Sequence, residues 1–316
     1  MPQLASYVGR RLLWTLPTLL LVSIMVFVMV RSIPGDPVQL MLGDQATSDE
    51  VQHLKVRLGL DKPVPVQFTI WLRQVLHGDL GKSITNDRPV LSLMLDRFQV
   101  TAVIVFLAVG SATLIAIPSG LLAAWKQNGR VDVIVVALAT LMMSVPSFWL
   151  GLLLLLVFGL KLGWLPVVGF VPFTENFWSA ITYIVLPVVT LALIEVGVLT
   201  RMVRASAIEV LRLEYVTHAR AKGLSEFRVL IRHVMPNAFA PTWTMIGLIL
   251  GGLLGGAAVL ETVFTLPGLG RLLVDAIFAR DYPVIQGCLL FTATLYVLVN
   301  LIVDLCYPLF DPRVTA

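Results

Sequence analysis

Six long apolar stretches constrain what this chain can fold into, because each is long enough to cross a lipid bilayer as a helix. Such a helix needs about 20 consecutive apolar residues, and none of the six stretches contains Lys, Arg or Asp. Of the 316 residues, 58% are hydrophobic and 13% are charged, whereas soluble domains carry about a quarter charged residues. We therefore expect an all-α polytopic membrane protein with six transmembrane helices. The predicted spans are Leu12–Val30, Val100–Ala124, Val133–Leu160, Ile181–Thr200, Val234–Leu260 and Tyr282–Val303.

Two of the spans are longer than a bilayer requires and contain residues that disturb a regular helix. Pro146 lies in the middle of the third span and is expected to kink it. The fifth span contains glycine pairs at 251–252 and 255–256, which allow a neighbouring helix to approach closely. For these glycines we favour a packing role over a hinge.

Basic residues in the short loops predict the orientation of the chain. One set of loops is rich in Lys and Arg, with seven basic residues from Arg201 to Arg232, whereas the opposite short loops contain only Lys161, Arg271 and Arg280. Because cytoplasmic loops collect basic residues, both termini are predicted to be cytoplasmic.

This orientation divides the chain into three parts. Residues 1–31 contain the N-terminus and the first transmembrane helix, residues 32–99 form an extracytoplasmic subdomain, and residues 100–316 form a five-helix core with a cytoplasmic loop at 201–237. The 32–99 segment alternates turns with short amphipathic runs, such as Val66–Leu76, which are suited to lie on a membrane surface.

The sequence lacks the motifs of a self-contained enzyme. Gly81-Lys-Ser83 is reminiscent of a phosphate-binding loop, but that motif needs a glycine where Leu76 stands. The histidines and cysteines do not show metal-ligand spacing, and Cys288 and Cys306 lie about 27 Å apart on one predicted helix, too far for a disulfide. The net charge of +4 follows from the basic loops and does not indicate nucleic acid. We expect no catalytic site, cofactor or metal, so any energy comes from a partner or an ion gradient.

A charged segment, EYVTHARAKGLSEFRVLIRHVMPN, interrupts the apolar sequence at residues 214–237 on the predicted cytoplasmic side. Span four is expected to end near Thr200. A first helix then covers Arg212–Lys222, because this stretch is free of Gly and Pro, and Gly223 follows where a helix end favours glycine.

A second short helix is expected to follow this glycine. Ser225 suits its N-cap and Glu226 its first turn, and the helix should stop at Met235, before Pro236. The ordered succession of helix, glycine, cap and proline favours a docking element over the alternative, a solvated basic loop that only enforces topology.

The first of these helices carries a narrow apolar stripe. Leu211, Tyr215 and Ala219 recur at i, i+4 and i+8, which places them on one helical face. We expect this face to be available to a groove on a soluble partner.

The segment resembles the cytoplasmic loop of permease subunits in the dipeptide and oligopeptide branch of ABC importers. That loop reads roughly E-D-Y-x-R-T-A-R-A-K-G-L-S and is followed by R-N-A. His218 departs from it, and the general importer motif, E-A-A-x-x-x-G with a later I-x-L-P, is matched only at Ala219, Gly223 and Pro236. The residues that match the branch are Glu214, Tyr215, Ala219, Arg220, Ala221, Lys222, Gly223, Leu224, Ser225, Asn237 and Ala238.

Seven further segments match the same branch in order over most of the chain. They are RR at 10–11, IPGDP at 33–37, LGLDKP at 58–63, GDLG at 78–81, LPGLGR at 266–271, RDYPVIQ at 280–286 and DPR at 311–313. The resemblance implies a type I importer permease fold in a bacterial inner membrane. It also implies four kinds of partner: a second homologous permease subunit, two cytoplasmic ATPases that hold ATP and Mg, an extracytoplasmic solute-binding protein and a peptide-like substrate.

The resemblance further implies which residues receive the ATPase. In such permeases the cytoplasmic loop carries the movement of the ATPase pair into the helix bundle, which then alternates between inward and outward access. Carried over to this chain, the implied docking residues are Glu214, Tyr215, Ala219, Arg220, Lys222 and Gly223.

Two of the polar residues within the predicted spans, Glu195 and Asn300, are candidates for a functional role, because such side chains are costly in a membrane. Glu195 either lines the pathway and meets a peptide ammonium, or pairs with Arg201, Arg204 or the second subunit; we favour pairing. Asn300 is suited to hydrogen-bond between helices.

Two other classes of protein compete with the importer hypothesis. A secondary transporter would show inverted repeats and a charged site at mid-membrane, and neither is evident in the sequence. A scaffold that anchors a soluble enzyme would have no need of a coupling loop. Among importers, the sequence leaves the cargo open between dipeptides, longer peptides, glutathione and nickel complexes.

Overall fold

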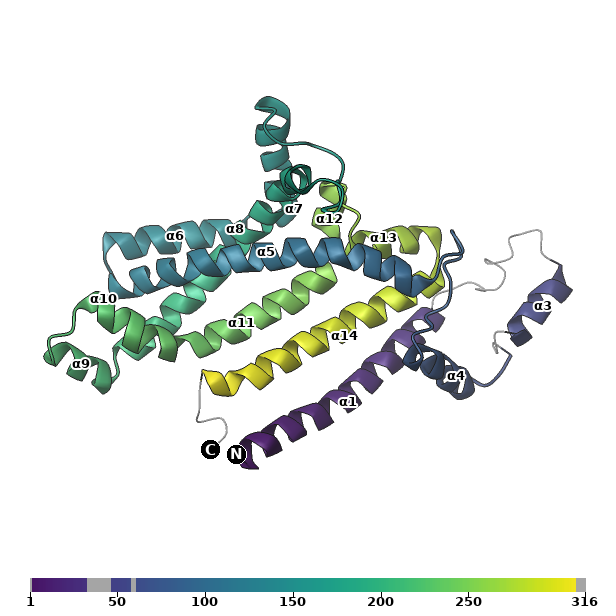
Figure 1. The fold of residues 1–316 in the computed structure, drawn as a ribbon, viewed down its shortest axis with the longest axis horizontal. Helices are drawn as coiled ribbons and strands as arrows, with labels where there is room; N and C mark the ends of the chain where they lie inside the picture. The colour runs from purple at the N-terminus through teal and green to yellow at the C-terminus, as the bar shows by residue number, and fades with distance from the viewer. Residues whose placement is uncertain (1, 33–46, 58–60, 311–316) are drawn as a thin grey trace.

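The computed structural model describes residues 2–32, 47–57 and 61–310, and these residues form helices without a β-strand. The motifs at 33–37 and 311–313 lie outside the described residues. In Figure 1 the long helices run beside one another, with α9 and α10 at one end of the bundle and α4 and α13 at the other. The helices are α1 (Pro2–Arg31), α3 (Ser48–Arg57), α4 (Val64–Leu76), α5 (Val90–Trp125), α6 (Arg130–Ser144), α7 (Ser147–Leu154), α8 (Phe177–Leu211), α9 (Glu214–Ala221), α10 (Glu226–Val229), α11 (Met235–Gly256), α12 (Ala258–Val263), α13 (Leu269–Ala279) and α14 (Tyr282–Cys306).

Five helical stretches within the described residues are long and apolar enough to cross a membrane, and a sixth is present if a bent pair counts as one span. They coincide with five of the six predicted spans. The five stretches are Ser6–Arg31, Val90–Trp125, Phe177–Leu211, Glu226–Gly255 and Tyr282–Leu309.

The third predicted span is the bent pair. Its two halves, Arg130–Ser144 and Ser147–Lys161, meet at 96°, so the expected kink is a complete break. Val145, which precedes the proline, has an extended ψ of 125°, because a following proline disfavours the α conformation. α7 begins directly after Pro146 and ends in a π-helical turn, Leu155–Lys161.

The predicted end of span four near Thr200 is wrong. α8 continues to Leu211, because Val203, Ala207 and Val210 keep one face of the helix packed against its neighbours. The change from apolar to charged residues after Thr200 therefore does not end the helix.

The predicted stop of the second loop helix before Pro236 is also wrong. α10 passes through a π-helical turn, Leu230–Val234, directly into α11. Pro236 follows shortly after this π-helical turn, and the helix continues through it.

Glycines allow the long helices to pack closely. A methyl group on Gly120 would lie 2.6 Å from Cβ of Val203, and one on Gly197 would lie 2.5 Å from a carbonyl oxygen of α6. A methyl group on Gly251 would lie 2.7 Å from the Tyr296 ring. The packing role predicted for the glycine pairs is thus confirmed at Gly251.

Two buried carboxylates stabilise the end of the bundle that carries α13. Glu261 accepts hydrogen bonds from Oγ1 of Thr101 (2.6 Å) and from the Arg271 N–H (2.8 Å) in the first turn of α13. Burial raises the pKa of the Glu261 carboxyl, and these hydrogen bonds act in the opposite direction. Asp281 accepts a hydrogen bond of 2.5 Å from Oγ of Ser83, and so fixes the turn after α4 to the start of α14.

Gly120→Ala is expected to destabilise the protein, because the added methyl group would overlap Val203 and the Thr200 carbonyl oxygen, 2.8 Å away. Overpacking of this kind costs about 1–3 kcal/mol. Gly110→Ala in the same helix is the matched control, since nothing lies within 4 Å of its added methyl group. Thermal unfolding in detergent checks this: only Gly120→Ala should melt at a lower temperature. Equal melting temperatures would contradict the described α5–α8 contact.

Candidate functional site

The short helix α9 lies at the end of the bundle and is held there by its inner face. Val216 is fully buried and Ala219 is 6% exposed. Both belong to one apolar cluster that also contains the adjoining ends of α5, α8, α10 and α11. Its other members are Leu121, Ala124, Val203, Ala207, Val210, Val229, Leu230, Val234 and Ala238. Since packed interiors resist deformation, a displacement of α9 would carry these helix ends with it.

The predicted apolar stripe along Leu211, Tyr215 and Ala219 is wrong. Leu211 ends α8, and the chain turns before α9 begins, so the three residues do not share one helix. Tyr215 is 39% exposed and donates a hydrogen bond of 3.2 Å to the His233 carbonyl oxygen. Ala219 faces the protein's own core, together with Val216, and is not available to a partner.

Gly223 reverses the chain after α9, as the sequence predicts. Its φ is +80°, in the left-handed region that favours glycine. The Gly223 N–H donates to the Arg220 carbonyl at 2.9 Å, and the Leu224 N–H donates to the Ala219 carbonyl at 3.4 Å. These are the two bonds of a Schellman motif. Nothing lies within 4 Å of an added Cβ at Gly223, so the requirement for glycine is conformational.

A side-chain pair joins the helices on either side of this turn. Nε of Arg220 donates to Oε1 of Glu226 at 2.9 Å, and Nη2 donates to Oε2 at 3.2 Å. Both side chains are more than one-third exposed, so the pair contributes at most about 1 kcal/mol. Ser225 occupies the N-cap position of α10, as predicted, but its side chain does not form the capping hydrogen bond.

The outer face of α9 is polar and open to a partner. Its exposed residues are Glu214, Tyr215, Thr217, His218, Arg220 and Ala221, and the exposed Lys222 follows directly after the helix. Phe227 of α10, which the sequence analysis did not single out, is 75% exposed. Interfaces between proteins are enriched in aromatic side chains, so Phe227 is a candidate contact beside the outer face of α9. Phe227 stands between two charged residues in the sequence, Glu226 and Arg228, so no apolar pattern pointed to it.

The predicted pairing of Glu195 with a nearby arginine is wrong. Arg204 instead forms a two-pronged ion pair with Asp132 of α6, and Arg201 contacts Sδ of Met143 at 3.8 Å. Glu195 is half-buried on α8 and makes no hydrogen bond or ion pair with any described residue. Asp132 was not predicted from the sequence; its signal was an acid in the first turn of a helix, where the helix dipole favours a negative charge.

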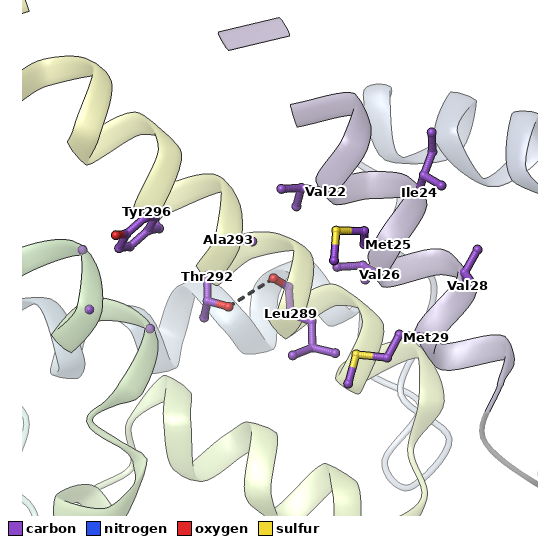
Figure 2. Close-up of a pocket in the computed structure, with 13 residues that line it drawn as sticks. Val22, Ile24, Met25, Val26, Val28, Met29, Leu289, Thr292, Ala293 and Tyr296 are labelled. Carbon is purple, nitrogen blue, oxygen red and sulfur yellow. Dashed lines mark hydrogen bonds between the residues drawn. The ribbon is translucent and has the colours of Figure 1, made fainter. Parts of the chain in front are cut away.

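A cavity of about 790 Å³ opens between α1, α11 and α14. Figure 2 shows Val22, Met25 and Met29 of α1 directed toward the α14 side chains that line it. The lining is apolar, and Thr292 uses its hydroxyl to bond the Leu289 carbonyl oxygen at 3.1 Å. Such a surface holds lipid or a helix more readily than a charged solute.

Asn300 lines an adjoining cavity of about 520 Å³ between α1 and α14. Arg11 and Asp304, which form an ion pair of 2.8 Å, stand at the same cavity. Glu195 lines neither of these two cavities. The structure therefore does not bring the two predicted intramembrane polar residues together.

Two family models match nearly all of the chain. Residues 116–316 match the binding-protein-dependent transport system inner membrane component, and residues 4–105 match the N-terminal part of the membrane component of such systems. A solved structure of the MetNI methionine ABC transporter in inward-facing conformations aligns with a TM-score of 0.58 at 17% identity. The alignment covers 70% of this chain and 97% of that chain, and shows a shared fold.

Several relatives are similar over their whole length. The chain is 40% identical to a putative peptide transport system permease protein of Brucella suis biovar 1, covering 98% of this chain and 99% of the relative. It is 40% identical to the dipeptide transport system permease protein DppB of Escherichia coli K12 and 41% identical to the glutathione transport system permease protein GsiC of Pectobacterium atrosepticum, with 98% of both chains covered in each case. The chain therefore belongs to the family of inner-membrane permease components of binding-protein-dependent ABC transport systems, whose ATPase activity lies in separate subunits.

Proposed function

We propose that this chain is the membrane-spanning subunit of an ATP-driven importer for dipeptides or oligopeptides. The names of the peptide and dipeptide transport relatives support this cargo. Glutathione, a small peptide named for another relative, is the alternative, and nickel complexes are a more distant one. The complete importer would contain a second homologous permease subunit, two cytoplasmic ATPases that bind ATP and Mg²⁺, and an extracytoplasmic binding protein.

The packing of α9 against the helix bundle is the observation that carries this proposal. Its outer face is exposed, while Val216 and Ala219 on its inner face share a core with the ends of α5, α8, α10 and α11. An ATPase docked on the outer face would therefore move several helix ends at once. Alternating access requires several helices to move together. A loop without a packed inner face would deform and would not pass the movement on to the helices.

The topology we propose places α9 and both termini in the cytoplasm and residues 32–99 outside, with the bent α6–α7 pair as a sixth span. The start of α1 and the end of α14 lie toward the α9 end of the bundle in Figure 1. Near the other end, Trp164 and Trp178 are 69% and 76% exposed, as suits aromatic side chains at a membrane–water interface.

Ala221→Arg is expected to weaken ATPase docking, because it adds bulk and charge to the outer face of α9 without touching the buried face. We expect at least a tenfold loss of affinity, equivalent to about 1.4 kcal/mol. Gln127→Arg, an exposed change in the α5–α6 turn, is the control. Co-purification with the ATPase subunits and ATP-dependent uptake measure the effect.

Full docking and uptake by the Ala221→Arg variant would contradict the assignment of α9. Uptake by the wild-type chain in the absence of any ATPase subunit would instead indicate a secondary transporter.

The proposed topology predicts opposite labelling of two lysine positions. With Cys288 and Cys306 replaced, Lys82→Cys should react with a membrane-impermeant thiol reagent in intact cells, and Lys222→Cys should react only after the membrane is opened. Both lysines are exposed on the protein surface, so a difference in labelling reports the side of the membrane and not burial within the protein. Labelling of position 222 from outside would reverse the proposed orientation.

Glu195→Gln is expected to change the rate of uptake by less than about threefold, without altering cargo preference. This corresponds to a change of under ~1 kcal/mol in activation free energy. The physical reason is that a pathway for cargo with variable side chains works best with weak contacts, since strong ones would retain some cargoes and reject others. Initial rates of uptake for several peptides measure this. If the variant assembled and hydrolysed ATP but lost all uptake, Glu195 would be a specific cargo or proton site.

A further inference from the structure

We propose that the ion pair between Asp132 and Arg204 is a clamp that makes α6 move with α8 when the ATPases displace α9. The inference rests on the proposed function and assigns a positioning role to two residues outside the docking helix. The family models and the relatives give no role to either residue.

The pair has the geometry of a two-point attachment. Nε of Arg204 donates to Oδ1 of Asp132 at 2.5 Å, and Nη2 donates to Oδ2 at 2.7 Å. Oδ2 also accepts the Asn128 N–H at 2.9 Å, and Asp132 is only 3% exposed. One buried carboxylate therefore connects the α5–α6 turn, the first turn of α6 and the middle of the extended part of α8. Two parallel bonds to a planar guanidinium fix orientation as well as distance.

Arg204 lies on α8 next to the residues that hold α9, so the attachment can pass a movement of α9 on to α6. The residues beside Arg204, Val203 and Ala207, belong to the cluster that holds α9. About two turns earlier, Gly197 contacts the backbone of α6 at Ala139. α6 and α8 also pack against each other beyond this glycine contact. The clamp adds a polar attachment at the α5–α6 end of this packing, where the two-point geometry holds the two helices in one orientation.

α6 in turn leads to the other end of the bundle. α7 follows α6 across the break at Pro146. Gly151 of α7 packs against the Phe264 ring beside α12. With the clamp in place, a displacement of α9 is passed through α8 to both α6 and α7. Without it, the α5–α6 end of α6 would lose its polar attachment to α8, less of the displacement would reach the far end, and more ATP would be hydrolysed for each substrate taken up.

An apolar pair would hold the two helices together at least as stably. Replacing a buried ion pair with apolar side chains is often neutral or stabilising, so stability alone does not account for charges at this position. A fixed orientation does account for them, because a bidentate pair holds both side chains, and the helix segments that carry them, in one relative orientation.

The first test measures coupling in the complete importer, reconstituted in lipid with its permease partner, ATPases and binding protein. Asp132→Asn and Arg204→Gln should each raise the ATP hydrolysed per substrate taken up by at least about threefold, with basal ATP hydrolysis retained. The double variant, which leaves no unpaired charge and guards against misfolding, should show the same ratio as either single variant. Arg201→Gln is the matched control on α8, because the one polar contact of Arg201 among the described residues is with Sδ of Met143.

The second test measures the movement directly. Spin labels at Val133 of α6 and Glu209 of α8, both exposed, should keep a constant separation between the nucleotide-free and ATP-bound states of the otherwise wild-type importer. The separation should change between these states in the double variant.

The outcomes separate this inference from the proposed function. An unchanged ATP-to-substrate ratio in the double variant, or a constant label separation in it, would overturn the clamp while leaving the importer intact. A wild-type complex that neither binds ATPases nor takes up peptide would overturn the proposed function itself.

Discussion

Close approach of helices at glycine is the constraint on which this structure depends. Lipid is as apolar as a leucine side chain, so helices inside a membrane gain little from hiding apolar surface and instead associate by tight van der Waals contact. Gly120, Gly197, Gly247 and Gly251 each face a neighbouring helix at a separation that a Cβ atom would not permit. These four contacts set the spacing of α5, α6 and α8, and of α11 and α14, and so position the helix ends that carry α9.

The buried or paired charged side chains described above lie toward the ends of the bundle. Arg11 pairs with Asp304 near the start of α1, and Glu261 is held by hydrogen bonds at the start of α13. The Asp132–Arg204 pair is the most buried of the ion pairs in the described part of the chain. Glu195 differs from all of these, because it has no partner in the described residues; a second subunit or a passing cargo is therefore free to reach it.

The sequence was sufficient for the features that a local rule determines. Apolar length located five of the spans, and a glycine after a short charged helix located the reversal at Gly223. It failed where tertiary packing overrides the local signal. α8 continues past the charged residues after Thr200 because the bundle still offers it an apolar surface, and this extension displaces Leu211 from the predicted stripe.

The buried face of α9 was missed for the same reason. Ala219 was expected to face a partner, but Val216 and Ala219 turn inward, so the face that α9 leaves exposed is the polar one. Asp132 was missed because its partner lies 72 positions away and no local pattern connects the two. Pairings of this kind depend on how helices cross, which hydrophobic periodicity does not specify.

The break at Pro146 gives an independent reason to expect a second subunit. Non-helical backbone at membrane depth is tolerated only where protein covers it or water reaches it, because lipid offers no hydrogen bonds. Ser144 and Pro146, on either side of Val145, are exposed in the isolated chain, and Trp149 of α7 is 49% exposed. If lipid surrounded this site, the carbonyl groups freed by the 96° bend would have no partner. A second permease subunit, or a water-filled path shared with it, supplies one. The break therefore supports the proposal that the complete importer contains a second permease subunit.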